Sequence, residues 1–107
     1  MKKLLLIFAC IFPLGAHAEF WTGTKLMQLL EEDQRGEASY SVGSASGFIV
    51  GVADALEGVV VCIPQGVTVK QIKQVVFNHM KSQPETWNQG AAYVTASALR
   101  RSWPCSK

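Results

Sequence analysis

The first eighteen residues constrain the fold of this chain more than any other feature of its sequence. Two lysines precede an apolar run over 4–14, which is too short to span a bilayer, and the run leads to Ala16, His17 and Ala18. This pattern predicts a secretory signal peptide, 1–18, that is cut after Ala18. Of the 107 residues, 89 then remain, and they fold in an oxidising compartment. We therefore expect one small exported domain over 19–107.

Removal of this segment changes the charge of the chain. Lys2 and Lys3 account for the excess of ten basic over eight acidic residues, so the mature chain carries no net charge. No stripe of basic and aromatic residues remains that could follow a phosphate backbone, so we expect no binding of nucleic acid. We also expect no stable membrane span after cleavage, because the apolar segment 38–57 contains Asp54, Glu57 and many small polar residues.

One pair of cysteines remains in the mature chain, because Cys10 is lost with the signal peptide. Two cysteines in an exported domain indicate a disulfide, here between Cys62 and Cys105. The alternatives are a nucleophilic thiol and a metal pair, but these need a nearby histidine or more ligands, and the mature chain has only His79. We expect a structural disulfide, no metal site and no cofactor.

Helical periodicity extends over most of the mature chain. Leu26, Leu29 and Leu30 have the spacing of an amphipathic helix, which we expect over 24–34. Gly36 ends this helix. A second helix is expected in the segment that follows.

Small residues repeat every four positions along this second helix, which is predicted over 38–57. They are Gly43, Gly47, Gly51 and Ala55. Each glycine weakens a helix by up to about 1 kcal/mol relative to alanine, so the repeat predicts a compensating contact. We expect another helix, or a second copy of the chain, to pack close to the backbone on this face. The alternative is a helix that is kinked or broken around Gly43.

The apolar run 59–64 has the composition of a strand. The mature chain offers no second strand to pair with it, so we expect a buried extended connection that leads to the disulfide. Thr68 and Gln71 then form a capping box, which predicts the start of a third helix that ends before Pro84. The buried stripe of this helix is predicted to comprise Val69, Ile72, Val76 and Met80.

A polar loop over 82–90 follows, and Trp87 is its large apolar residue. A fourth helix is expected over about 89–102. Its periodic residues are Tyr93, Ala96, Leu99 and Trp103. Four short helices with short connections and one disulfide predict an all-α fold, a small bundle of about four helices.

The sequence nominates no catalytic residues. His79 falls within a helical run, and no pattern pairs it with a nucleophile. The three consecutive acids over 31–33 do not share one helix face, and the glycine repeat lacks the ending of a phosphate-binding loop. We therefore do not expect an enzyme.

Three motifs occur in order along the chain: GFIVGVADAL over 47–56, CIPQGVT over 62–68 and a segment over 98–105 that ends in WPC. Together they resemble the Rap/Tai family of immunity proteins. The resemblance implies a small helical antitoxin, often a homodimer, in a bacterium with a type VI secretion system. Its expected partner is a peptidoglycan amidase effector, which it binds and inhibits in the periplasm. Many relatives carry a further cysteine pair in a region where this chain has Leu29, Leu30, Ala45 and Ser46.

An inhibitor of this kind needs a rigid scaffold and an element that fills a cleft of its partner. Trp87 is the candidate anchor, and Glu85, Thr86, Asn88 and Gln89 are the candidate polar contacts around it. The alternative is that Trp87 packs on its own domain. A second hypothesis for the whole chain is an HdeA-like periplasmic acid-stress chaperone, although eight acids are few for release of apolar surface by protonation.

Overall fold

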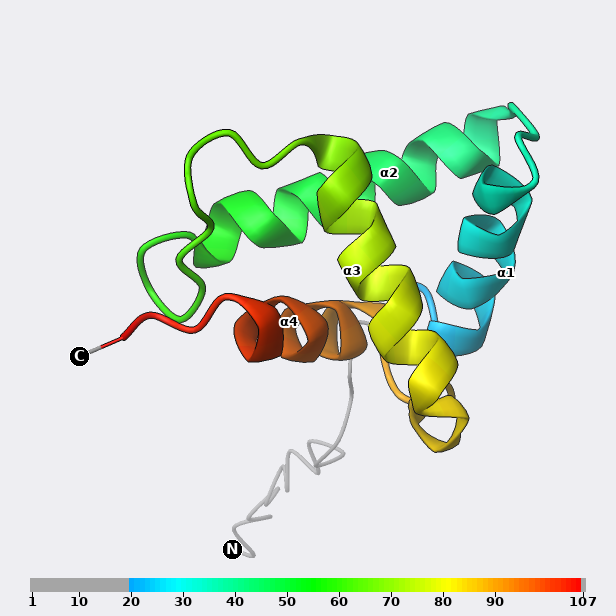
Figure 1. Cartoon of the computed structure of the whole chain (residues 1–107). Helices are drawn as coiled ribbons and strands as arrows, with labels where there is room; N and C mark the ends of the chain where they lie inside the picture. The colour runs from blue at the N-terminus through cyan, green and yellow to red at the C-terminus, as the bar shows by residue number, and fades with distance from the viewer. Residues whose placement is uncertain (1–19, 107) are drawn as a thin grey trace, which may run out of the picture.

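The structure, a computed structural model, describes residues 20–106, and these form four α-helices and one 3-10 helix (Figure 1). The elements are α1 (Gly23–Gln34), α2 (Tyr40–Leu56), α3 (Val69–Ser82), η1 (Pro84–Thr86) and α4 (Ala91–Ser102). Each predicted helix is present within two residues of its expected ends, and the prediction of an all-α fold is confirmed. The predicted signal peptide and its cleavage site lie outside the described residues.

Local hydrogen bonds explain where the helices begin. Thr22, Ser39 and Thr68 each accept a hydrogen bond, through the side-chain oxygen, from the backbone N–H three residues further on. The side chain of Gln71 accepts in return from the backbone N–H of Thr68 at 2.7 Å, which confirms the predicted capping box. Gly36 follows α1 with a φ of +78°, a conformation that favours glycine.

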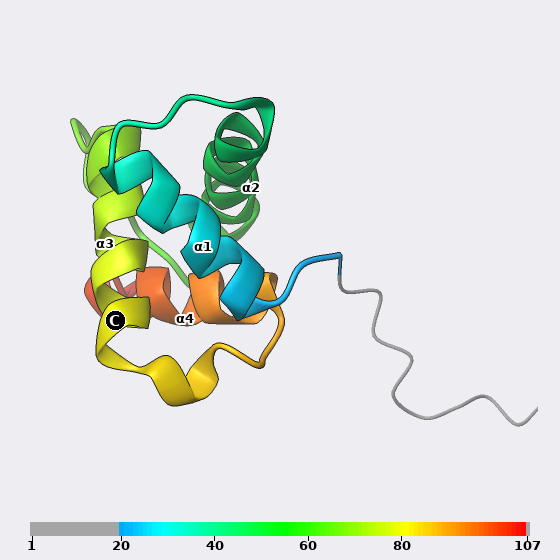
Figure 2. The same cartoon turned by 90° about the vertical axis from the view of Figure 1, so that its right-hand side faces the viewer.

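Each of the four helices contacts the other three around one apolar core. In Figure 1, α3 crosses in front of α2 and α4. Figure 2 shows α1 across one end of the bundle, with α3 on one side, α2 on the other and α4 below. The largest fully buried apolar side chains are Leu26, Leu29, Leu30, Ile49, Val61, Val76, Met80, Val94 and Leu99.

Two predicted helix faces are wrong in part. Val69 is 46% exposed rather than buried, because it is the first residue of α3 and no preceding turn covers it. On α4, Tyr93 is 63% exposed whereas Leu99 is fully buried. Six residues turn a helix by about 600°, which leaves these two side chains about 120° apart on α4. The face of α4 that is buried consists of Ala91, Val94, Thr95, Ala98 and Leu99.

The second helix is continuous, since the N–H of Gly43 donates to the carbonyl of Ser39 and α2 extends to Leu56. The alternative of a helix kinked or broken around Gly43 is therefore wrong for the described α2. The apolar connection after it is only partly buried, because Val61 is fully covered while Val59 is 71% exposed. Isolated β-bridges join Val61 to Glu57 and to Pro104 in the C-terminal segment, and no sheet is present among residues 20–106.

Cys62 and Cys105 form the predicted disulfide, with their Cα atoms 4.9 Å apart. The backbone N–H of Cys62 also donates to the carbonyl of Trp103 at 2.8 Å. The C-terminal segment and the connection between α2 and α3 therefore lie together, on the left of Figure 1. This cross-link holds the end of α4 against the end of α2.

Candidate functional site

The polar loop predicted over 82–90 is folded tightly against the domain. Its first part is η1, in which Thr86 Oγ1 donates to the carbonyl of Gln83 at 2.8 Å. Further on, the N–H of Gln89 donates to the carbonyl of Thr86 at 3.0 Å. The loop is thus preformed and presents polar side chains to solvent. Of the predicted polar contacts, Glu85, Asn88 and Gln89 are exposed and Thr86 is half-buried.

The second part of this loop is hydrogen-bonded to the start of α1. The N–H of Gly23 donates to the carbonyl of Gln89 at 2.7 Å, and the N–H of Thr24 donates to the carbonyl of Trp87 at 2.7 Å. Figure 1 shows the two segments side by side at the lower right, where the blue start of α1 meets the loop below α3. Backbone pairing between distant segments was not predicted from the sequence.

Gly23 is the point of closest approach between α1 and the loop. A Cβ atom on Gly23 would lie 2.9 Å from the carbonyl oxygen of Trp87 and 3.0 Å from its Cα. We expect Gly23→Ala to push the loop away and to lower the free energy of unfolding by about 2 kcal/mol. Urea unfolding measures this change. Gln28→Ala, at an exposed position of α1, is the control and is expected to change stability by less than about 0.5 kcal/mol. Equal stability of the two variants would contradict this close contact.

Trp87 packs on its own domain, which is one of the two alternatives left open by the sequence. The ring is half-buried against the apolar core, and Nε1 donates to the carbonyl of Met80 at 2.7 Å. The indole N–H is therefore already satisfied within the chain. The role of Trp87 as an anchor in a partner stays a prediction, and it depends on the part of the ring that is still accessible.

Trp87 also lines an open groove between α1 and α3. Met27 and Phe77 contribute apolar walls, and charged side chains such as Glu31 and Lys81 lie around them. Lys81 Nζ lies 5.6 Å from the centroid of the Phe77 ring, within the range of a cation–π contact. The groove can thus accept an apolar group that is flanked by polar ones.

A small polar pocket of about 130 Å³ lies between the loop, α3 and α4. Thr86 and Gln89, two of the predicted contact residues, line it together with His79 and Tyr93. Burial lowers the pKa of His79, and the positive charge of Arg101 lowers it further. Because protonation of His79 then costs more in the folded than in the unfolded chain, stability falls as the pH drops below the ordinary value of 6.5.

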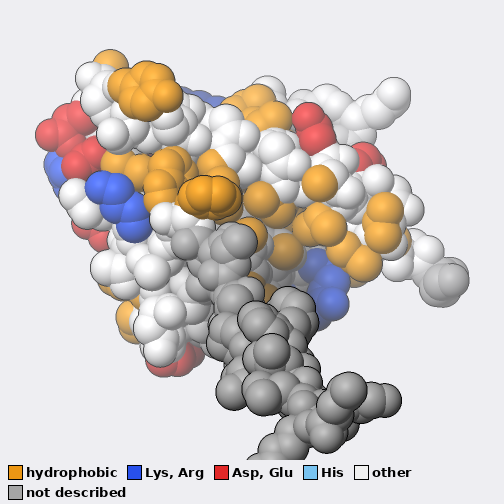
Figure 3. All heavy atoms as spheres, turned by 180° about the vertical axis from the view of Figure 1, so that it is seen from behind, with side chains coloured by type: hydrophobic (Ala, Val, Ile, Leu, Met, Phe, Trp, Pro, Cys, Tyr) orange, Lys and Arg blue, Asp and Glu red, His pale blue; other side chains and the backbone are white. Residues whose placement is uncertain are grey.

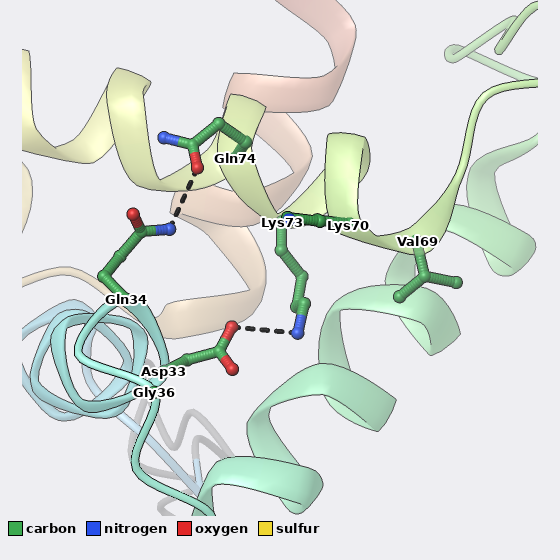
Figure 4. Close-up of a pocket in the computed structure, with 7 residues that line it drawn as sticks. All are labelled: Asp33, Gln34, Gly36, Val69, Lys70, Lys73 and Gln74. Carbon is green, nitrogen blue, oxygen red and sulfur yellow. Dashed lines mark hydrogen bonds and ion pairs between the residues drawn. The ribbon is translucent and has the colours of Figure 1, made fainter.

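Another hollow, of about 560 Å³, lies between the end of α1 and the start of α3 (Figure 4). Lys73 Nζ lies 2.8 Å from Asp33 Oδ2 and donates to Ser46 Oγ at 3.1 Å, so one ammonium group links three helices. The hydroxyl of Ser46 donates in turn to the carbonyl of Val42 at 3.3 Å. Since Lys73 is paired with a carboxylate and the Ser46 proton is engaged, this serine and lysine act as a structural link.

The four residues of the predicted packing face, Gly43, Gly47, Gly51 and Ala55, are all exposed along α2. A Cβ atom on any of the three glycines would meet no atom of another element within 4 Å. No helix within residues 20–106 therefore packs against this face. Figure 3 shows the side of the molecule on which α2 lies, where many hydrophobic side chains are accessible and the charged ones lie mostly toward the edges.

Two kinds of feature are absent from residues 20–106. No group of three or more His, Cys, Asp or Glu side chains lies close enough together to hold a metal ion there. Within the same residues, no helix has the length and apolar character needed to cross a bilayer. The features that the structure does bring together are the loop, the polar pocket beside it and the exposed face of α2.

Comparison with protein families gives a match over most of the chain. The family model described as Rap1a immunity proteins matches residues 22–105, from the N-cap of α1 to the second cysteine of the disulfide. The match covers all four helices and includes the three sequence motifs on which the resemblance was based. No curated protein matches the chain.

Proposed function

The chain belongs to the Rap1a immunity protein family, and from this premise we propose that it is a periplasmic antitoxin. It binds a peptidoglycan amidase that a type VI secretion system delivers, blocks the activity of this effector and so protects the producing cell from itself and its siblings. The family match over residues 22–105 is the observation that carries the proposal. Inhibition by binding requires no catalytic group, and we infer that the chain is not an enzyme.

Two features support export as part of this proposal. The sequence over 1–18 has the basic start, the short apolar run and the small residues of a cleaved signal peptide. The disulfide between Cys62 and Cys105 is of a kind that persists in oxidising compartments and is rare in the cytosol. A delivered wall-degrading enzyme acts in the same compartment.

The loop over 82–90 is the element that we propose to contact the effector. Its backbone is held by η1 and by the hydrogen bonds to Gly23 and Thr24, so little conformational entropy is lost when it binds. Glu85, Asn88 and Gln89 offer exposed polar groups, and the accessible part of Trp87 offers an apolar one. A preformed loop of this kind suits a cleft that it fills without rearrangement.

We further infer that two copies of the chain associate through the exposed face of α2. The glycines on this face allow two backbones to approach closely, and a Cβ atom at Gly47 would meet no atom of another element within 4 Å in one copy. Sedimentation equilibrium of the mature protein is expected to give a dimer, and Gly47→Leu is expected to give a folded monomer. A wild-type protein that is monomeric at micromolar concentration would exclude this association.

The test of the proposed function is coexpression of the full chain with each periplasm-directed amidase effector encoded in the same genome. We expect the chain to prevent lysis by one of these effectors and to form a complex with it. A chain without residues 1–18 should fail to protect, and an unrelated secretion signal in their place should restore protection. Failure to rescue or to bind any of the effectors would exclude the proposed function.

A further inference from the structure

Helix α4 carries an exposed aromatic residue between two neighbouring hollows. Tyr93 is 63% exposed and, together with Ser97, lines both of them. The first hollow is the polar pocket beside the loop. The second, of about 240 Å³, is more apolar and lies where α4 meets the end of α2. Its other lining residues are Leu56, Val60, Ala96 and Arg100.

The polar pocket holds several side chains with hydrogen-bonding groups that are not used within the described part of the chain. Among residues 20–106, the side chains of His79, Gln83, Gln89, Tyr93 and Ser97 take part in none of the side-chain hydrogen bonds, whereas Thr86 Oγ1 does. Five polar side chains from α3, α4 and the loop therefore converge on one small space. Most of these side chains can donate a hydrogen bond.

The charged side chains that line these two hollows are basic. No aspartate or glutamate lines either hollow, while Arg100 lines the second one. Arg101 follows it on the last turn of α4 and is close enough to His79 to act on it electrostatically. Donor-rich and basic surroundings favour a carboxylate, which accepts hydrogen bonds and pairs with arginine.

We propose that the surface around Tyr93 is a second contact site for the effector, and that it receives a carboxylate side chain of the effector together with an adjacent apolar side chain. The carboxylate enters the polar pocket beside His79, the apolar group enters the hollow beside Leu56, and the Tyr93 ring packs between them. Exposed tyrosine and arginine residues are the types that most often dominate binding energy at interfaces. This inference rests on the proposed function, because the effector supplies both groups.

The experiment uses the effector that the full chain inhibits in the coexpression test, purified in a catalytically inactive form. Tyr93→Ala is expected to weaken its affinity by about 30-fold or more, which is the range of a dominant interface residue. Arg100→Glu is expected to slow association at low salt, and high salt should reduce this difference. Tyr93→Phe separates the ring from the hydroxyl and is expected to lose less than Tyr93→Ala.

Tyr40→Ala is the matched control, because Tyr40 is 92% exposed and lies at the start of α2. It should bind the effector with an affinity within about threefold of that of the wild type. The variants at Tyr93 and Tyr40 should unfold at the same urea concentration as the wild type, since both tyrosine side chains are exposed. Wild-type affinity in both Tyr93→Ala and Arg100→Glu would overturn this site and leave the proposed function standing. A photo-crosslinker at position 93 that captures a second copy instead of the effector would also overturn it. If the wild type binds no effector, the proposed function fails first, and this inference fails with it.

Discussion

Replacement of both Cys62 and Cys105 by serine is expected to lower the free energy of unfolding by about 4 kcal/mol. The disulfide joins residues 43 positions apart, and a cross-link over such a loop removes much of the conformational entropy of the unfolded chain. Small domains are stable by only about 5–15 kcal/mol in total, so this loss is a large share. Urea unfolding of the oxidised wild type and of the double variant measures it.

Reduction of the wild type provides the control for this prediction. The reduced wild type should unfold at nearly the same urea concentration as the Cys62→Ser, Cys105→Ser variant, because both lack the cross-link. Reducing agent should leave the double variant unchanged. A double variant as stable as the oxidised wild type would show that the cross-link adds little to this fold. An unfolded variant would itself report a loss at least as large as expected.

Trp87→Ala is expected to lower the free energy of unfolding by about 3 kcal/mol, the lower end of the range for truncation of a packed tryptophan. The ring packs against the core and Nε1 donates to the carbonyl of Met80, so the substitution removes apolar contact and one of the two hydrogen bonds to this carbonyl, which keeps the bond from the N–H of Gln83. Thermal or urea unfolding measures the change. Wild-type stability in this variant would contradict the packing of Trp87 on its own domain.

Because Trp87→Ala lowers stability, its effect on effector binding must be compared with that of a variant that loses a similar amount of stability at a site away from the loop. Trp103 is also half-buried against the core, but it follows α4 at the opposite end from the loop. Trp103→Ala is therefore expected to lose stability of the same order while it leaves the loop in place. If Trp87 is an anchor, its variant should bind the effector more weakly than the Trp103 variant under conditions in which both are folded. Equal binding would assign Trp87 a structural role only.

The positions of the helices could be predicted because they depend on local signals. Thr68 and Gln71 mark the start of α3 through a capping box, and Pro84 limits its end. The side of α4 that is buried could not be predicted as well. Alanine occurs on several sides of this helix, so the apolar spacing does not distinguish the face with Val94 from the face with Tyr93.

The candidate site was only partly predictable for a related reason. The sequence points to the loop through Trp87 and its polar neighbours, which are contiguous along the chain. It does not reveal that His79 and Tyr93 approach the same loop from two other elements, since that depends on how α3 and α4 pack. The contact of the loop with α1 consists mainly of backbone hydrogen bonds, beside one from Thr24 Oγ1 to the carbonyl of Trp87, and its clearest trace in the sequence is the glycine at position 23.

That same contact has a consequence for the order in which the chain folds. Thr24 and Trp87 are 63 residues apart, so the chain from α1 through η1 must be available before the loop can close on α1. Contacts between distant segments require loop closure before they contribute energy, and they tend to form late. If the chain is exported from its N-terminus, as proposed, it therefore emerges without this surface. The surface is completed only when α1 and the loop over 82–90 are on the same side of the membrane, so a copy retained halfway would lack the loop surface that we propose to contact the effector.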